Sequence, residues 1–265
     1  MPFTPAHAAA AFPFRRTSLV WSAVIVGTMA PDFEYFLHFA PEGRHGHTMP
    51  GILVLTLPLA LATLWLFHKF VKMTVVELMP RCLERRLIPY AGPFKFGGAA
   101  RFALILGSIL VGVATHLIWD SFTHPNGWSV LHWQALRQSV RAPLLREAPL
   151  YKLLQYASTI AGLAFLMVWL IVWYRGAAAS ALPPMRSGSA WPARRLAILA
   201  AIIAVAGIGA VAISAATTPI PQNFMALLHF MVPVVVAGVA LIWWELVLLG
   251  IVRLKQKTNQ AAAGS

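Results

Sequence analysis

The chain contains only two aspartates, and one of them lies in a regular pattern with two histidines. The segment His116-Leu-Ile-Trp-Asp120-Ser-Phe-Thr-His124 has the spacing H-x3-D-x3-H. On an α-helix, residues four apart project from the same face, so we expect these three side chains to point the same way. Imidazole with carboxylate is the ligand set typical of Zn²⁺, with Fe or Mn as less common alternatives. The spacing therefore predicts a metal site on one helix, which ends before Pro125.

The second aspartate, Asp32, ends an apolar segment, and the loop that follows contains His45 and His47. We expect Asp32 and His47 to join the site and His45 to lie exposed in the loop. Two aspartates could bridge two metal ions and neutralise part of their charge. Zn²⁺ lowers the pKa of a bound water to about 7, so such a site would have a nucleophile at neutral pH. The pattern thus favours hydrolytic chemistry with one or two metal ions.

The residues around these motifs are unusually apolar. Of 265 residues, 59% are hydrophobic and 11% are charged, whereas soluble domains carry roughly 25% charged residues. The mean hydropathy is +0.71. This composition excludes a soluble enzyme, a disordered chain and a collagen-like repeat. The single cysteine, Cys82, excludes an intramolecular disulfide.

Six apolar segments are predicted to form the helices that hold the site. They comprise residues 18–30, 52–71, 102–122, 153–174, 196–216 and 224–252. A membrane-spanning helix needs about 20 residues, so the last five segments are long enough and the first is too short. The sequence therefore predicts an all-α, multi-pass membrane protein. We expect one membrane-embedded domain over residues 1–260, with an appended tail, Ala-Ala-Ala-Gly-Ser, at 261–265.

The basic residues predict the orientation of the chain in the membrane. The net charge of +13 is interpreted as a topology signal, not as nucleic-acid binding. Lys and Arg concentrate in the linkers 72–100 and 175–195 and after residue 252. Because cytoplasmic loops carry the excess of positive charge, we assign these segments to the cytoplasm. The C-terminus is then cytoplasmic, and both aspartates with their neighbouring histidines face outside.

The first histidine, His7, has two alternative positions. If residues 18–30 span the membrane, His7 is cytoplasmic and cannot join the site. If residues 5–31 form a re-entrant hairpin that enters from outside, His7 lies level with Asp32. Thirteen residues cover only about 20 Å of helix, short of a hydrocarbon core of about 30 Å, and this favours the hairpin. Thr4 and Pro5 are expected to begin its first helix, with Thr4 as N-cap.

Four motifs carry a resemblance to a known family: Met1-Pro-Phe-Thr-Pro-Ala-His7, Met29-Ala-Pro-Asp32, His47 to Gly51, and 115–124. They resemble an uncharacterised family of bacterial membrane proteins that opens with this N-terminal motif. That family is similar to inner-membrane metal-dependent hydrolases, which are related to zinc-dependent phospholipase C and the P1-type nucleases. The resemblance covers about residues 1–130.

The resemblance implies an all-helical core, phosphoester hydrolysis and a set of six metal ligands: His7, Asp32, His47, His116, Asp120 and His124. The soluble relatives carry a further H-x3-E pair on a later helix. The only such spacing here is His38 to Glu42, which comes early and encloses Pro41. We therefore expect one or two ions of Zn²⁺, with Fe or Mn as alternatives, and not three.

These observations lead to a hypothesis of a zinc-dependent membrane hydrolase, with Asp32 and Asp120 as its catalytic residues. Its substrate is expected to be a phosphoester of a lipid or lipid-linked head group at the outer face of the bacterial inner membrane. Two other classes stay open, namely a transporter or metal-handling protein and a membrane protein with a structural metal site.

A pair of basic residues is the predicted substrate contact. Arg137 and Arg141 are spaced four apart, close in sequence to Trp128 and Trp133, and could hold a lipid phosphate at the interface. The alternative interpretation is a solvated amphipathic face. The expected partner is a membrane lipid and not a nucleic acid. The oligomeric state is not predicted.

Overall fold

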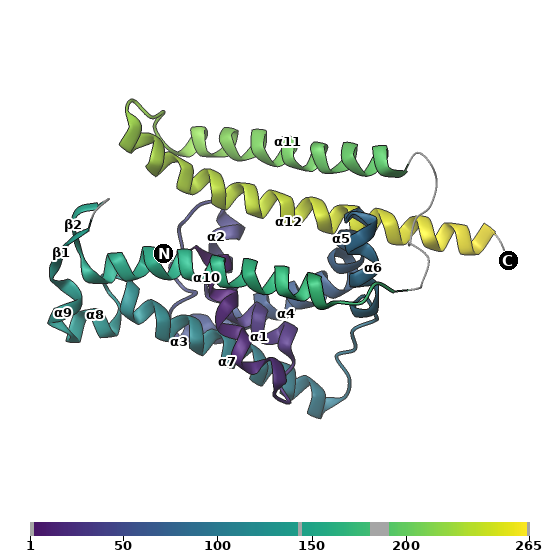
Figure 1. The fold of residues 1–265 in the computed structure, drawn as a ribbon, viewed down its shortest axis with the longest axis horizontal. Helices are drawn as coiled ribbons and strands as arrows, with labels where there is room; N and C mark the ends of the chain where they lie inside the picture. The colour runs from purple at the N-terminus through teal and green to yellow at the C-terminus, as the bar shows by residue number, and fades with distance from the viewer. Residues whose placement is uncertain (1–2, 143–144, 181–190, 264–265) are drawn as a thin grey trace. The chain divides into compact units, whose positions relative to one another are not determined.

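The structure is a computed structural model that describes residues 3–142, 145–180 and 191–263. Five helices in this part of the chain are long and apolar enough to cross a membrane. They are Met49–Leu78, Ala99–His132, Leu150–Gly176, Trp191–Thr217 and Ala226–Ala262. This confirms the prediction of a mostly helical protein with apolar helices of membrane-spanning length (Figure 1).

The chain divides into two compact units. The first comprises Met1–Phe33, Arg44–Leu61 and Phe96–Arg175, and the second comprises Glu34–Gly43, Ala62–Lys95 and Gly176–Ser265. All six predicted metal ligands belong to the first unit. The prediction of a single domain over 1–260 stays a prediction. Residues 181–190 of the basic linker and 264–265 of the tail lie outside the described residues.

Residues 4–32 form a hairpin. The 3₁₀ helix η1 (Thr4–Arg16) leads through an exposed turn into α1 (Trp21–Met29) and the short 3₁₀ helix η2 (Ala30–Asp32). A 3₁₀ helix rises about 2.0 Å per residue, so the 13 residues of η1 extend about 26 Å. Arg15 and Arg16 lie exposed at the turn. This is the hairpin alternative from the sequence, and it brings His7 and Asp32 into the same unit.

The long helix α7 (Ala99–Thr123) packs closely against α1 (Figure 1). Glycines make this possible, because a Cβ at Gly112 would overlap the carbonyl oxygen of Val24, and one at Gly27 would overlap that of Ile109. Small residues at a helix interface let two backbones approach in this way. The two backbones therefore fix the position of Asp32, just after α1, relative to the C-terminal half of α7.

Further helical segments of the first unit are α3 (Met49–Gly51), the π-helix η3 (Ile52–Thr56), α8 (Trp128–His132) and α10 (Leu150–Gly176). The helix α4 (Leu57–Leu66) runs from the first unit into the second. α10 contacts the hairpin through aromatic rings, with Trp169 set edge-on to both Phe12 and Trp21. Gln155 is the only buried residue of α10, and most of the other residues of this helix are exposed.

The region after α8 contains a short helix and a two-stranded β-hairpin. The short helix α9 (Gln134–Arg137) ends at Arg137, and β1 (Ser139–Ala142) then pairs antiparallel with β2 (Leu145–Pro149), with Val140 opposite Ala148. Arg137 and Arg141, four apart in the sequence, therefore lie in different elements and not on one helix. Pro143 disfavours helical backbone in the residue before it, and β-branched Val140 suits a strand. Arg141 instead pairs on the surface with Glu147, at 3.4 Å.

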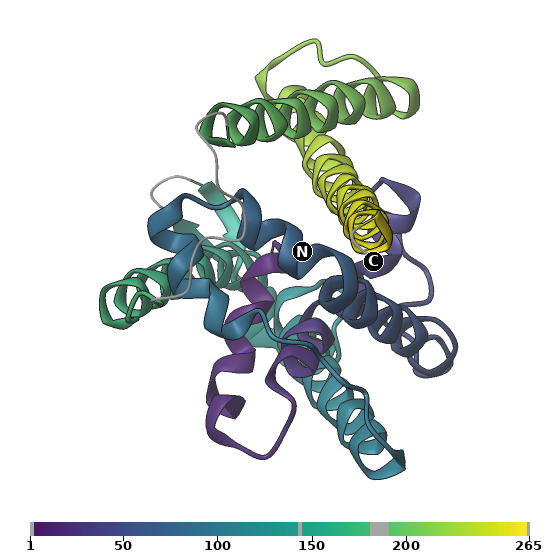
Figure 2. The same cartoon turned by 90° about the vertical axis from the view of Figure 1, so that its right-hand side faces the viewer.

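The second unit contains mainly the C-terminal helices. α11 (Trp191–Thr217) and α12 (Phe224–Ala263) pair antiparallel (Figure 1), and Figure 2 shows the same two helices, in green and yellow, viewed toward their ends. Its other helical segments are α2 (Phe33–His38), η4 (Phe67–Val71), α5 (Lys72–Leu78), α6 (Arg81–Leu87) and η5 (Ile88–Tyr90). A buried ion pair of 2.7 Å joins Arg253 of α12 to Glu77 of α5. Because neither charge is solvated, each stabilises the other in place.

The predicted orientation can be tested with cysteine labelling. Native Cys82 is exposed in the basic 72–100 linker. If this linker is cytoplasmic, a membrane-impermeant maleimide applied to spheroplasts should label Cys82 only after permeabilisation. In a Cys82→Ser background, Glu42→Cys should react without permeabilisation. The neighbouring Gly43 is unsuitable for this labelling, because a side chain there would overlap the ring of Tyr35. The opposite labelling pattern would reverse the orientation.

Candidate metal centre

The centre of the site is one turn of α7 that carries His116 and Asp120. Nε2 of His116 lies 3.2 Å from Oδ2 of Asp120, as the four-residue spacing predicts. On its other side, Nδ1 of His116 donates to the carbonyl oxygen of Thr28 at 2.8 Å. A carbonyl can only accept, so Nδ1 carries the proton and a neutral His116 presents a lone pair at Nε2. Such a backbone contact is what orients a histidine for metal binding.

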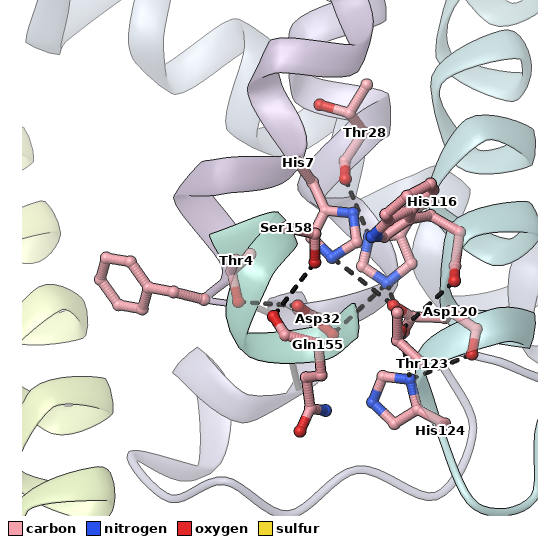
Figure 3. Close-up of polar contacts among 12 residues, drawn as sticks. Thr4, His7, Thr28, Asp32, His116, Asp120, Thr123, His124, Gln155 and Ser158 are labelled. Carbon is pink, nitrogen blue, oxygen red and sulfur yellow. Dashed lines mark hydrogen bonds and ion pairs between the residues drawn. The ribbon is translucent and has the colours of Figure 1, made fainter. Parts of the chain in front are cut away.

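The hairpin contributes His7, which lies over His116 (Figure 3). The two rings are stacked with centroids 4.0 Å apart, and Nε2 of His7 is 3.5 Å from Oδ1 of Asp120. Burial is the main cause that lowers the pKa of His7, to about 3. His7 is therefore neutral at physiological pH and has a lone pair available. Its Nε2 is buried and has no hydrogen-bond partner.

Asp32 is completely buried beside these histidines. Its Oδ2 accepts a hydrogen bond of 2.7 Å from the hydroxyl of Thr4. Its Oδ1 has no hydrogen-bond partner and lies 3.5 Å from Nε2 of His47 and 3.7 Å from Nε2 of His116. Burial raises the pKa of Asp32 because it disfavours the charged form. A nearby cation would reverse that effect.

The loop before α3 supplies His47 from the more open side of the site. Nε2 of His47 lies 3.2 Å from Nε2 of His116 and 3.4 Å from Oδ2 of Asp120. The loop is tight, because Thr48 accepts from the backbone N–H of Gly51 and a Cβ at Gly51 would overlap the carbonyl oxygen of His45. About a third of the His47 side chain is exposed, against none of His116.

These atoms form two overlapping groups that could hold a metal ion. One is His7, His116 and Asp120, and the other is Asp32, His47 and His116. Their N–O separations of 3.2 to 3.7 Å agree with the spacing of about 3.3–3.6 Å expected for tetrahedral ligands at 2.0–2.2 Å from Zn²⁺. In these two groups, Nε2 of His7, Oδ1 of Asp32 and Oδ1 of Asp120 are buried and have no hydrogen-bond partner. The donor set therefore fits a divalent cation.

A family model titled "Domain of unknown function (DUF4184)" matches residues 1–251. The chain belongs to the DUF4184 family. No curated protein and no solved structure matches it.

In this DUF4184 chain, the structure brings together five of the six predicted ligands: His7, Asp32, His47, His116 and Asp120. The sixth, His124, leaves the helix. It is the C-cap residue of α7 with extended backbone, as expected for a residue before proline. Its Nδ1 donates to the carbonyl oxygen of Asp120 at 3.2 Å and lies 3.5 Å from that residue's Oδ2 (Figure 3). His124 therefore contacts Asp120, but it belongs to neither group of three.

Two supporting residues were missed in the sequence. Thr4 was expected to be a helix N-cap, but Phe3 occupies that position and makes no side-chain cap, while the Thr4 hydroxyl bonds Asp32. The backbone carbonyl of Thr28 orients His116, although the side chains of α1 include no titratable group that would have indicated such a contact. Contacts of this kind depend on how the hairpin packs on α7. No local pattern could have indicated them.

The Thr4 hydroxyl gives a testable prediction. Thr4→Val keeps the shape of the side chain but removes the hydrogen bond to buried Asp32. We expect the affinity for metal to be roughly 10–100-fold weaker, as is typical when a group that orients a ligand is lost. Thr4→Ser keeps the hydroxyl and should retain the affinity. Competition with a fluorescent chelator measures both, and equal affinities for the Val and Ser variants would contradict the role of this hydrogen bond.

Proposed function

We propose that this DUF4184 chain is a metal-dependent membrane hydrolase that cleaves a phosphoester of a lipid or lipid-linked head group. The observation that carries the proposal is that five donors from four segments of the chain form two groups of three that share His116. Two of them are buried carboxylates, which are costly to ionise without a compensating positive charge. A single divalent cation would balance Asp32 and Asp120 together.

The donor geometry favours one ion. Both groups of three use Nε2 of His116, and an imidazole nitrogen has a single lone pair to offer. The two groups are therefore alternative positions for one ion, because two ions would compete for that nitrogen. We expect Zn²⁺ from the histidine-rich donor set, with Fe or Mn as alternatives.

Uneven burial of the ligands supports catalysis over a purely structural role. His7, Asp32 and His116 are closed off from solvent, whereas about a third of the His47 side chain is exposed. A structural zinc site is closed on every side, while a catalytic site keeps one position open. When bound, the metal would supply a nucleophilic water at neutral pH and stabilise charge on a phosphoryl group.

The surroundings of the site support a lipid head group as substrate. Asp120 lies three residues before the end of α7, and α8 and α9 follow at once. Trp128 and Trp133 are strongly exposed there, as is typical of residues at a membrane interface. Arg137 ends α9 and Arg141 lies in β1, and we propose them as separate head-group contacts. The family resemblance to metal-dependent phosphoesterases supports the reaction class, and positive charge elsewhere in the chain supports an outer-face site in a bacterial inner membrane.

The proposal is tested on the purified protein in lipid nanodiscs. Elemental analysis should find about one transition-metal ion per chain, and phosphate or phospho-head-group release from phospholipids should stop when the metal is removed by chelation and return on adding Zn²⁺. Metal content without any hydrolysis of a phospholipid panel would point to a structural site or a transporter. Absence of any transition metal, or two ions per chain, would overturn the proposed centre itself.

A further inference from the structure

An apolar groove runs beside the metal centre between η1, α7 and α10. Its volume is about 450 Å³, which is in the range of ligand-binding sites. Small residues from the hairpin and α10, among them Ala6, Ala10, Ala161 and Gly162, form much of its wall. Isoleucine and tryptophan side chains of α7, at Ile118 and Trp119, form another part and are largely exposed.

The groove is continuous with the candidate site through one residue. His7 lines the groove, and its Nε2 points to Asp120 on the other side (Figure 3). Because η1 is a 3₁₀ helix, residues three apart lie on one edge, and Ala10 continues the wall from His7. A molecule lying in the groove therefore ends beside the proposed ligands.

The polar side chains in the wall leave little for a polar ligand to bind. The hydroxyl of Thr115 donates to the carbonyl oxygen of Gly112 at 2.7 Å, and that of Ser158 donates to the carbonyl oxygen of Gln155 at 3.1 Å. Both hydroxyls are thus satisfied within their own helices. Both α7 and α10 are of membrane-spanning length, so the open side of the groove faces hydrocarbon when these helices span the bilayer.

We propose that this groove binds one hydrocarbon chain of the lipid substrate, which enters sideways from the bilayer and places its head group at the metal centre. The inference rests on the proposed function for the identity of the head group. A second apolar groove, between Leu53 and Ala114, has a volume of about 350 Å³. It contains no residue of the His/Asp cluster, so its filling should not matter. This second groove provides the matched control.

The test fills each groove with the same side chain. Ala161→Phe and Ala10→Phe block the first groove from opposite walls, and Ala114→Phe fills the second; Ala161 and Ala114 are both exposed. Each protein is placed in nanodiscs with a phospholipid that carries a diazirine in mid-chain, irradiated, and mapped by mass spectrometry. In the wild type we expect adducts concentrated on 4–16, 115–119 and 158–162. The adducts should fall at least about tenfold in both blocking variants, because keeping only two methylene groups of the lipid chain out of the groove already weakens binding about tenfold. They should stay unchanged in Ala114→Phe.

Two outcomes would overturn the inference. One is adducts spread evenly over the exposed faces of α7 and α10, and the other is wild-type adducts in both blocking variants. The photolabelling does not depend on turnover, so adducts in the groove without hydrolysis would refute the proposed function and leave the groove as a lipid site. Where hydrolysis is observed, Ala161→Phe should reduce turnover of long-chain substrate and spare a dihexanoyl substrate. Equal loss on both substrates would contradict a hydrocarbon-binding role.

Discussion

Asp120→Asn should abolish metal binding and the proposed hydrolysis while leaving the protein folded. Asp120 is the residue that all four histidines around the site approach, with their nitrogens at 3.2 to 3.5 Å from its carboxylate oxygens. The asparagine keeps the size of the side chain and removes the negative charge. Loss of a group that only orients a ligand already costs 10–100-fold in affinity, so we expect at least about 100-fold here.

The stability of the variant separates this effect from misfolding. A metal that binds only the folded state stabilises it by about 4 kcal/mol when its free concentration is 1,000 times the dissociation constant. The wild type should therefore lose thermal stability on chelation, whereas Asp120→Asn should be insensitive to the chelator. Its stability should be close to that of the metal-free wild type, because neither protein holds the metal and the substitution only neutralises one buried carboxylate.

A second carboxylate provides the control for Asp120. Glu147 lies on β2 in an exposed pair with Arg141, and exposed pairs contribute little to stability. Glu147→Gln should keep its metal content, its activity and its response to chelation. A normal metal content in Asp120→Asn would contradict the assignment of Asp120 as a ligand, whatever its activity.

The parts of the site that the sequence predicted are those set by local geometry. The spacing of His116 and Asp120 fixes their relation on any α-helix. The short first apolar segment favoured a hairpin over a span, and the family resemblance added His7 to the ligand set. His47 could be placed near them because the charge pattern assigned its loop to the same membrane side.

The parts that the sequence could not give depend on chain ends and on packing. His124 obeys the helical spacing, but the helix ends just before it and its backbone is extended. Arg141 also obeys a helical spacing, yet Val140 and its neighbours pair with a second strand. The spacing of residues in so short a segment cannot distinguish a four-residue helix from the start of a β-hairpin. The Thr4 and Thr28 contacts arise only when η1 and α1 pack on α7.

That packing depends on two glycines, and Gly112 is the more informative to change. A Cβ at Gly112 would meet the backbone nitrogen of Thr28 at 2.6 Å and would overlap the carbonyl oxygen of Val24. Neither atom can move as a flexible side chain would, so the two helices must separate. Separation would also lengthen the 2.8 Å contact between Thr28 and His116 that orients the histidine.

Gly112→Ala is therefore expected to destabilise the protein by about 3 kcal/mol, the upper end of the usual cost of overpacking, and to weaken metal binding as well. Gly107 lies on the same helix with no atom within 4 Å of an added Cβ. Gly107→Ala should leave stability unchanged or raise it slightly, since alanine favours helix over glycine. Thermal unfolding of both variants, with and without chelator, gives the comparison. If Gly112→Ala and Gly107→Ala had the same effect on thermal stability, close contact between α1 and α7 could not be what holds Asp32 and His116 together. Changes in stability of opposite sign would tie the metal centre to that single helix crossing.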